Sequence, residues 1–438
     1  MEKNVFSFDG TTTIKSAIHR PEKYDTLFNI LAKGNFIPRG AGLSYCLASA
    51  DEKCASIDSK IFDRVLSFDK IKGLITVEAG MNMGELLQIV MAASFTFPVL
   101  PGYPKITVGG CIAFNIHGKS QYNIGLFSKY INRLKLFHPA HGEIECSQIN
   151  NADIFHLTIG GFGLTGFITE VELILLPLGG KNILRSKVMV KNLSAAIAEM
   201  SQKKDAFMSA YSWNNLNLTK NKFGKGIVYF EKYCSEESTQ TKVKPYNNLT
   251  SDGRRKLLFS FLNKFTINLE CYAYNYLEAL GKSQTISKVE NALFPINGKE
   301  IYFKLFGKQG LREYQLIIPF EHWGNFEDEL KQLINKLGIA ICLGSLKLFD
   351  GNQKFLSFNK TGICMAIDVP ATNASLLFFD KLDELVLRNE GIANISKDSR
   401  LSKEVIQKMY PEYDSFKMQI INFEKTFPLY STLRRRIF

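Results

Sequence analysis

The segment "GGFGLTG", residues 160–166, contains the glycine spacing G-x-G-x-x-G at positions 161, 163 and 166. Such glycines hold a dinucleotide when a strand precedes them and a helix follows, because the pyrophosphate then lies at the helix N-terminus. Here residues 151–159, "NADIFHLTI", have helical spacing with Asn151 as the expected N-cap, and residues 167–176, "FITEVELILL", alternate like a strand. The order is reversed, which excludes a Rossmann nucleotide site.

Two further glycine clusters lie upstream of this segment. "RGAG", residues 39–42, follows an expected short strand, and "VGG", residues 108–110, lies in the Gly- and Pro-rich segment 98–120, for which we predict loop backbone close to a ligand. Peptide N–H groups exposed by glycine can bind an anion, and glycine lets the main chain approach a flat ring. Three such loops suit a large ligand with a pyrophosphate and a ring system, although each one alone is equally consistent with a turn.

Periodicity predicts the elements around these loops. We expect a helix over residues 24–33, a strand over 73–80 that leads through Asn82 into a helix over 83–93, and a hairpin over 130–146. From about residue 181 to residue 391, strands and helices are mixed. The chain therefore combines α and β structure, without an internal repeat.

Length and composition limit the class of protein. A chain of 438 residues is too long for one ordinary core, so we expect two or three domains. The net charge of +12 favours phosphates, anionic lipid or nucleic acid without choosing among them. No apolar run approaches the roughly 18 residues of a membrane span, and "MEKNVFSFDG" lacks a basic-then-apolar signal. We expect a cytoplasmic protein, with peripheral membrane contact left open.

The reactive residue types show no metal-site spacing. The eight cysteines and six histidines are scattered, which predicts buried free thiols and no metal centre. Residues 232–251, rich in Lys, Ser, Thr and Glu, predict a surface loop. "RRKLLFSFLNKF", residues 254–265, predicts either a partly buried helix with basic ends in solvent or contact with a membrane or lipid tail. The final "LRRRIF", residues 433–438, predicts a solvated end or a phosphate contact.

Four segments of the first half resemble the FAD domain of the superfamily of vanillyl-alcohol oxidase and p-cresol methylhydroxylase, in order and in spacing. They are "PRGAGLSY" (38–45), "VEAGMNMGELLQ" (77–88), "PVLPGYPKITVGGCIAFNIHGKS" (98–120) and "TIGGFGLTGFITEVEL" (158–173). The second half resembles the branch formed by the flavin subunits of decaprenylphosphoryl-β-D-ribose 2′-epimerases, in "FKLFGKQGLREYQLIIP" (303–319), "SLKLFDGNQKFLSFNKTGICMAIDVP" (345–370) and "SKDSRLSKEVIQKMYPEYDSF" (396–416). The likeness is weakest over residues 181–296.

The resemblance implies a fold and a domain organisation. The fold class is α+β, a two-domain PCMH-type FAD-binding fold with a separate substrate domain built on an antiparallel sheet flanked by helices. Residues 1–178 would form the FAD-binding domain and residues 179–391 the substrate-binding domain. Residues 392–438 would form a C-terminal segment that returns to the FAD domain.

The same resemblance implies the cofactor, FAD, and its binding residues. Several relatives attach the flavin through a histidine at the position of Leu43, and because leucine cannot form that bond we predict non-covalent FAD. Where the oxidase branch has Gly-Asp after the tyrosine, this chain has Cys46 and Leu47, so local pyrophosphate contacts should differ. The implied cofactor-binding residues are Arg39, Gly40, Ala41, Gly42, Leu43, Ser44, Tyr45, Pro101, Gly102, Val108, Gly109, Gly110, Ile116, His117, Gly118, Gly163, Ile168 and Asn394.

For the reaction, the resemblance implies oxidation of a sugar secondary alcohol to a ketone. Lys397 matches a lysine placed by the flavin and substrate, and Tyr45 and His117 are further catalytic candidates; His117 is equally consistent with a structural hydrogen bond. The implied substrate-binding residues are Lys119, Gln315, Lys347, Cys364, Ala366 and Lys397.

Two positions of the expected substrate pocket depart from the family. Ala366 stands where relatives have a cysteine that captures nitroso-type inhibitors, so that capture should fail here. Phe306 replaces a common tyrosine and removes one hydroxyl from the expected pocket.

Three functions remain open at this point. The first is oxidation of a lipid-linked or nucleotide-linked pentose, with a short-chain reductase as partner to complete epimerisation. The second is an aldonolactone or alditol oxidase of the same superfamily. The third is a basic, non-catalytic nucleic-acid-binding protein, for which the sequence shows no recognition motif.

Overall fold

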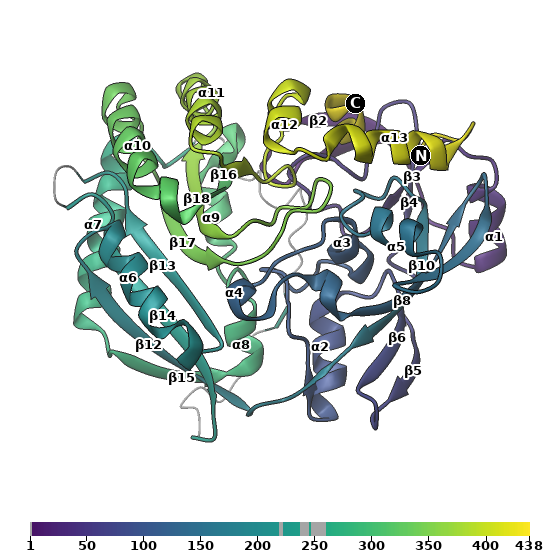
Figure 1. The fold of residues 1–438 in the computed structure, drawn as a ribbon, viewed down its shortest axis with the longest axis horizontal. Coiled ribbons are helices and arrows are strands. Elements are labelled where there is room, and N and C mark those ends of the chain that lie inside the picture. The colour runs from purple at the N-terminus through teal and green to yellow at the C-terminus, as the bar shows by residue number, and fades with distance from the viewer. Residues whose placement is uncertain (1, 219–221, 237–244, 247–259) are drawn as a thin grey trace.

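The computed structural model describes residues 2–218, 222–236, 245–246 and 260–438. Within these residues the chain forms a mixed α/β fold with five sheets, of which four are entirely antiparallel. Figure 1 shows the N-terminal half on the right, the middle of the chain on the left, and the C-terminal helices along the top. The division into an FAD domain and a substrate domain stays a prediction.

The first sheet has the strand order β1-β2-β4-β3 and carries the "RGAG" loop at the end of its last strand. Strands β3 and β4 run parallel, so the loop leaves from the carboxyl end of β3. The predicted helix over residues 24–33 is confirmed as α1. The elements are β1 (Glu2–Phe6), β2 (Thr13–His19), α1 (Tyr24–Leu31), β3 (Phe36–Arg39) and β4 (Ala55–Asp58).

The second sheet, β5-β6-β10-β8-β9, is antiparallel and supports the other two glycine clusters. Its central strand β10 (Phe167–Ile174) follows α5 (Ala152–Thr158), which confirms the helix, glycine turn, strand order. The alternating residues of β10 are buried, as predicted. The remaining strands are β5 (Val65–Asp69), β6 (Leu74–Glu78), β8 (Ile131–His138) and β9 (Gly142–Ser147), and β7 (Phe95–Thr96) pairs separately with β11 (Leu176–Pro177).

Two local predictions in this half are wrong. The segment 98–120 is not all loop, because Thr107 caps a short helix, α3 (Val108–Ala113), with its hydroxyl accepting from Gly110 N. Asn151 precedes α5 but does not cap it; its backbone is left-handed, and its side-chain amide donates to Glu145 O instead. The helix α2 (Met83–Ala92) is confirmed with Asn82 as its N-cap. Two short helices complete this half, α4 (Gln121–Ile124) and η1 (Phe127–Tyr130).

The middle of the chain forms a sheet with the order β13-β14-β12-β15 and helices on both faces. On one face, α6 (Leu193–Lys203) packs through Met200 in the same core as Phe230. On the other, Tyr274 of α7 (Lys264–Leu280) bonds to the hydroxyl of Tyr229, one residue before Phe230 and hence on the opposite face. The strands are β12 (Asn182–Val190), β13 (Ser209–Asn215), β14 (Lys225–Cys234) and β15 (Gln284–Lys288), followed by α8 (Val289–Leu293) and α9 (Ile301–Leu305).

The last sheet, β17-β18-β16-β19, brings distant segments together. One hydrophobic core runs from α1 and β4 to this sheet and its covering helices, so the two halves are packed together. The elements are β16 (Leu311–Ile318), α10 (Trp323–Leu337), β17 (Leu343–Phe349), β18 (Gly362–Pro370), α11 (Asn373–Arg388), β19 (Ile392–Ala393), α12 (Lys403–Met409), α13 (Tyr413–Glu424) and α14 (Thr432–Ile437).

The C-terminal arginines have partners within the protein, so the predicted solvated end is wrong. Arg434 forms a buried ion pair with Glu424, and Arg435 Nε donates to Asp51 Oδ2 at 2.6 Å. Arg436 Nη1 donates to the backbone oxygen of Asp398 at 2.9 Å.

Two sequence tracts are only partly described. The tract 232–251 begins inside strand β14, and its residues 237–244 and 247–251 lie outside the described residues. The predicted helix over 254–265 falls outside them up to residue 259, and α7 begins at Lys264. None of the described helices is long and apolar enough to cross a membrane.

Candidate active site

A cavity of about 200 Å³ lies among the loop after β3, the helix α3 and the glycine turn before β10. All three glycine clusters predicted from the sequence therefore border one space, which we call the glycine-lined cavity. Of the predicted residues, it is lined by Arg39, Gly40, Ala41, Gly42, Leu43, Ser44, Tyr45, Gly109, Gly110, Ile116, Gly163, Ile168 and Lys397. Val108 is not among them, because it is fully buried at the start of α3.

The loop after β3 presents backbone donors to this cavity. Among the described residues, the peptide N–H groups of residues 40–44 find no hydrogen-bond acceptor. Consecutive free N–H groups of this kind form a binding site for an anion such as a pyrophosphate. Gly42 adopts φ +66°, a left-handed conformation that favours glycine, and a Cβ there would displace the Arg39 guanidinium.

The second glycine cluster contributes differently. Gly109 N donates to Ala79 O at 2.8 Å, and Gly110 N donates to Thr107 Oγ1 at 3.2 Å. These two N–H groups are therefore engaged within the protein. A Cβ on Gly40 would lie 2.2 Å from Thr107 Oγ1, so the absence of side chains lets the two loops approach closely.

Two side chains that line the glycine-lined cavity, Tyr45 and Lys397, share a contact with Glu313. Tyr45 Oη donates to Glu313 Oε2 at 2.7 Å, and Lys397 Nζ lies 3.3 Å from the same oxygen. The Lys397 ammonium also lies over the Tyr45 ring, 4.5 Å from its centre. Two of the predicted catalytic residues are thus joined by a carboxylate that sequence reasoning missed.

A second chain of contacts runs through His117. Asn394 Nδ2 donates to Gln315 Oε1 at 2.7 Å, so the Gln315 amide nitrogen faces His117 Nε2, 3.2 Å away. An amide nitrogen only donates, which makes His117 Nε2 the acceptor and places the ring proton on Nδ1. Burial, and then the positive charges of Lys347 and Lys397, hold the pKa of His117 well below its ordinary value. A neutral, oriented imidazole follows.

A second cavity of about 230 Å³ adjoins the first at residues 116–118, because Ile116 lines one and His117 the other. Of the other predicted residues, it is lined by Pro101, Gly102, Gly118, Lys119 and Lys347. Pro101 and Gly102 therefore border this second cavity and not the loop after β3.

The two lysines of the second cavity differ in their contacts. Lys119 Nζ pairs with Glu231 and donates to Ala292 O at 2.9 Å, and burial lowers its pKa to about 8. Lys347 Nζ makes no hydrogen bond or ion pair with any residue that the structure describes, and burial lowers its pKa too. Lys347 is consequently the cation available to an anionic ligand.

The remaining predicted substrate residues lie on strands β16 and β18. Cys364 and Ala366 on β18 pair with Ile317 and Gln315 on β16, and Cys364 also pairs with Lys347 on β17. Neither lines either of the two cavities described above. Burial raises the pKa of the Cys364 thiol to about 12.

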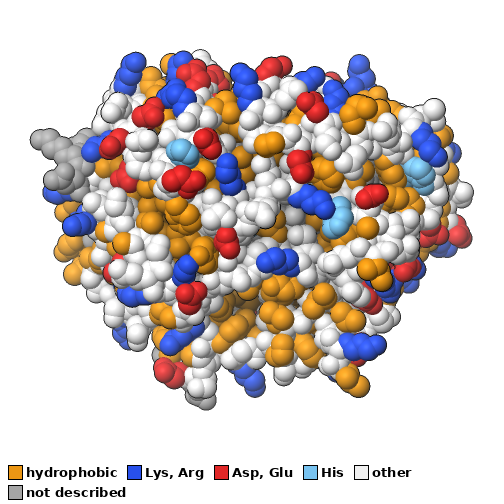
Figure 2. Space-filling view, viewed as in Figure 1, with side chains coloured by type: hydrophobic (Ala, Val, Ile, Leu, Met, Phe, Trp, Pro, Cys, Tyr) orange, Lys and Arg blue, Asp and Glu red, His pale blue; other side chains and the backbone are white. Residues whose placement is uncertain are grey.

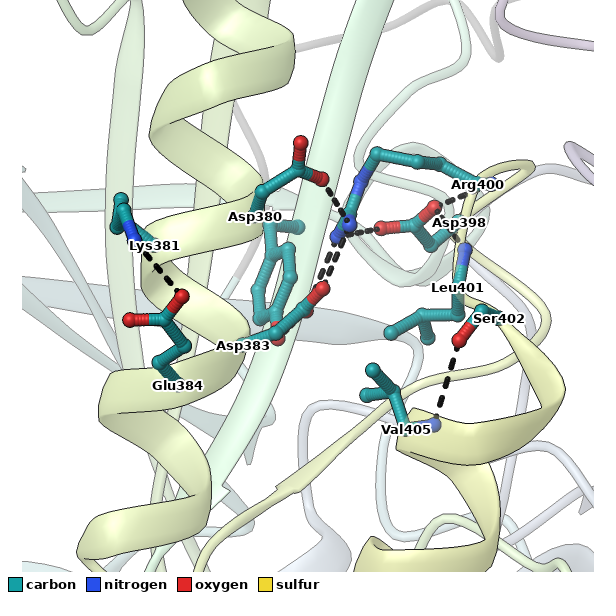
Figure 3. A network of polar contacts seen from close by, with 10 residues as sticks. Asp380, Lys381, Asp383, Glu384, Asp398, Arg400, Leu401, Ser402 and Val405 are labelled. Atoms are coloured by element: carbon teal, nitrogen blue, oxygen red, sulfur yellow. Dashed lines mark hydrogen bonds and ion pairs between the residues drawn. The ribbon is translucent and has the colours of Figure 1, made fainter.

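The segment that carries Lys397 is clamped on its C-terminal side. Figure 3 shows the Arg400 guanidinium between Asp380, Asp383 and Asp398, with a 2.6 Å contact to Asp383 Oδ2. On its N-terminal side, Asn394 N donates to Gln315 O at 2.8 Å. The loop around Lys397 is therefore fixed at both ends.

Besides Glu313, sequence reasoning missed the acid next to it. Asp368 lies directly opposite Glu313 in the β16–β18 ladder and accepts from Tyr302 Oη at 2.9 Å. Burial and the Glu313 carboxylate raise the pKa of Asp368 well above its ordinary value. The only sequence signal was two acids on strands otherwise dominated by apolar residues.

Comparison with known proteins identifies the cofactor. A family model described as an FAD binding domain matches residues 17–147. Decaprenylphosphoryl-beta-D-ribose oxidase of Mycolicibacterium smegmatis is 26% identical over 390 residues, which cover 87% of this chain and 84% of that protein. The chain is an FAD-dependent oxidoreductase. The flavoprotein resemblance and the FAD prediction are confirmed.

Other relatives of this FAD-dependent oxidoreductase match shorter stretches. Mitochondrial L-galactono-1,4-lactone dehydrogenase of Brassica oleracea is 29% identical over 136 residues, which cover 31% of this chain and 21% of that protein. Delta(24)-sterol reductase of Rattus norvegicus is 27% identical over 113 residues, covering 26% of this chain and 22% of that protein.

The residues of the oxidoreductase fit FAD. The free N–H groups of residues 40–44 suit its pyrophosphate, and the glycine-lined walls suit close approach of a flat ring. The non-catalytic hypothesis is wrong. Lys, Arg, Asp and Glu are also interspersed over the face in Figure 2, without the basic stripe of a nucleic-acid-binding surface.

Proposed function

We propose that this oxidoreductase oxidises a secondary alcohol of a phosphate-linked pentose to a ketone, with the 2′-hydroxyl of a polyprenylphosphoryl pentose as the preferred target. The observation that carries the proposal is the contact of Lys397, Glu313 and Tyr45 at the wall of the glycine-lined cavity. The name and long coverage of the mycobacterial relative support the substrate class.

Each of these side chains has a role in the proposed reaction. Bound FAD supplies a hydride acceptor for the carbon that carries the hydroxyl. The Lys397 ammonium holds the substrate oxygen and stabilises the negative charge that develops there. Glu313, an acceptor 3.3 Å from Lys397 Nζ, takes the hydroxyl proton. Tyr45 orients that carboxylate through its 2.7 Å hydrogen bond.

Two further groups position the substrate. His117 has its Nε2 occupied by Gln315, so it orients neighbouring groups and does not act as the base. Lys347 faces the second cavity without a partner among the described residues and would bind the substrate's phosphate. The two adjoining cavities thus suit a flavin and a phosphorylated sugar.

The residue at position 43 bears on how the cofactor is attached. Leu43 lines the cavity where several relatives carry a histidine, so FAD should be released by acid precipitation of the protein.

A ketone made at the 2′ position completes an epimerisation only if a second enzyme reduces it. A short-chain reductase is therefore the expected partner.

The second candidate function is oxidation of an aldonolactone or alditol. The partial match to the plant lactone dehydrogenase favours it, although that match covers less than a third of this chain. Such substrates carry no phosphate, so they give no role to Lys347.

Substrate-dependent bleaching of the flavin separates the two functions. Under anaerobic conditions, purified holoprotein is mixed with a polyprenylphosphoryl pentose, a soluble lactone or an alditol, and the visible flavin absorbance is followed. Bleaching by the phosphorylated pentose alone supports the proposal. Bleaching by a lactone or alditol, with none by the pentose, would assign the second function.

A further inference from the structure

An apolar stripe runs along the whole length of the exposed side of helix α7. Seventeen residues form this helix, and its inner face packs through Ile267 and Cys271 in the same hydrophobic cluster as Tyr45. Figure 1 labels α7 at the outer edge of the molecule. Six large apolar side chains point outward and are 57–76% exposed, namely Phe265, Leu269, Tyr272, Tyr276, Leu277 and Leu280. We call these six residues the α7 face.

The spacing shows that this exposure is not scattered. Positions 265, 269, 272, 276 and 280 follow the i, i+4, i+7, i+11, i+15 pattern of one helical stripe. No charged residue lies within that stripe, and the exposed Glu270 lies outside it, one helical repeat before Leu277. Glu278 lies on the other side of the helix, where it pairs with Lys187. A contiguous apolar surface of this size on a water-facing helix indicates an interaction site.

The charges at the two ends of α7 indicate which partner fits. Lys264 begins the helix and Lys282 follows its end, and both side chains are exposed. If α7 pairs with the same helix of a second copy, lysines face lysines whether the two helices run parallel or antiparallel. A bilayer with anionic headgroups neutralises both lysines while the stripe enters the headgroup boundary.

We propose that the α7 face docks this protein on the surface of an anionic lipid bilayer. Aromatic and aliphatic side chains on one helix face, with lysines at both ends, are typical of helices that lie in the interface plane. Helix α7 then lies parallel to the bilayer, and its inner side, which belongs to the cluster that contains Tyr45, faces away from the lipid. The proposal rests on this surface and not on the identity of the substrate.

Vesicle sedimentation tests this proposal without any substrate. Holoprotein is mixed with phosphatidylcholine vesicles that contain either no phosphatidylglycerol or one part in three, and the bound fraction is measured. We expect binding to the anionic vesicles that weakens in high salt. The variant Leu269→Gln/Tyr272→Gln/Tyr276→Gln should lower the vesicle affinity by about tenfold or more.

A matched control separates the α7 face from general exposure of apolar groups. Ile71 and Ile149 are each 98% exposed and lie in the other half of the chain, so Ile71→Gln/Ile149→Gln should bind vesicles like the wild type. The flavin spectrum of each variant verifies folding. Absence of vesicle binding, or equal binding by the triple variant, overturns the proposal. A dimer in light scattering that the triple variant dissociates would assign the face to a second copy instead.

Discussion

Replacing Glu313 by glutamine is the most informative change at the active site. Glutamine has nearly the same shape and can still accept from Tyr45 Oη, but it carries no charge and cannot take a proton. Glu313 Oε2 lies 3.3 Å from Lys397 Nζ, and at an effective dielectric constant of about 20 such a pair is worth about 5 kcal/mol before screening. Because Lys397 is 30% exposed, solvent leaves about 1–3 kcal/mol of that attraction.

The loss of the proton acceptor adds to the loss of this attraction. General-base catalysis contributes about 10²–10⁴-fold to a rate, so Glu313→Gln should slow flavin reduction by at least about 10²-fold. Substrate affinity should change much less, because the phosphate contact at Lys347 is untouched.

Anaerobic stopped-flow absorbance measures flavin reduction in this variant directly. Saturating polyprenylphosphoryl pentose is mixed with wild-type protein, with Glu313→Gln, and with Glu329→Gln as a control. Glu329 pairs with Arg388 on the surface, so its loss should leave the rate unchanged. If Glu313→Gln binds FAD normally and reduces it within about threefold of the wild-type rate, the assignment of Glu313 as the proton acceptor is wrong.

Three further predictions concern the cofactor loop, the clamp and acid stability. Gly42→Ala should weaken FAD binding by about tenfold or more in a fluorescence titration, since its Cβ would displace the Arg39 guanidinium, which lines the glycine-lined cavity. Gly142→Ala has the same left-handed strain with open space around it and should bind FAD normally. Arg400→Ala should lower the free energy of unfolding by about 3–5 kcal/mol in urea titrations, because it leaves buried carboxylates without their cation. Burial lowers the pKa of His138 to about 4, so the unfolded chain binds more protons between about pH 6.5 and 4, and stability falls as the pH drops through that window. In thermal melts at a series of pH values, His138→Gln should reduce the loss of stability between about pH 6.5 and 4 by up to about 3 kcal/mol. An unchanged loss would show that other groups cause the acid sensitivity.

The parts of the fold that the sequence predicts are those with strong local signals. The strand β10 alternates cleanly, and Asn82 caps α2 through a contact three residues away, so both follow from short-range chemistry. The helix α3 was missed because two glycines and a nearby proline indicate a loop, whereas its hydroxyl cap and packed position stabilise a helical turn. The Asn151 cap failed because a backbone oxygen of β9 competes for the side chain.

The active site shows the same division. The sequence alone indicates the roles of the glycines at 40, 42 and 163 and of the lysine at 397, because each lies in a short local motif. Glu313 could not be recognised, since its role arises from a strand that lies beside Tyr45, 268 residues away in the chain. The clamp around Arg400 likewise depends on packing between α11 and the segment after β19.

The rate of flavin reduction in Lys397→Ala tests the central claim most directly, namely that the side chains at the wall of the glycine-lined cavity carry out the proton chemistry. The variant is mixed anaerobically with a sugar that bleaches the wild-type flavin, and Lys381→Ala, an exposed lysine on α11, serves as the control. We expect Lys397→Ala to retain FAD and to show no bleaching on the wild-type timescale, while the control bleaches normally. Bleaching of Lys397→Ala at the wild-type rate would contradict the account.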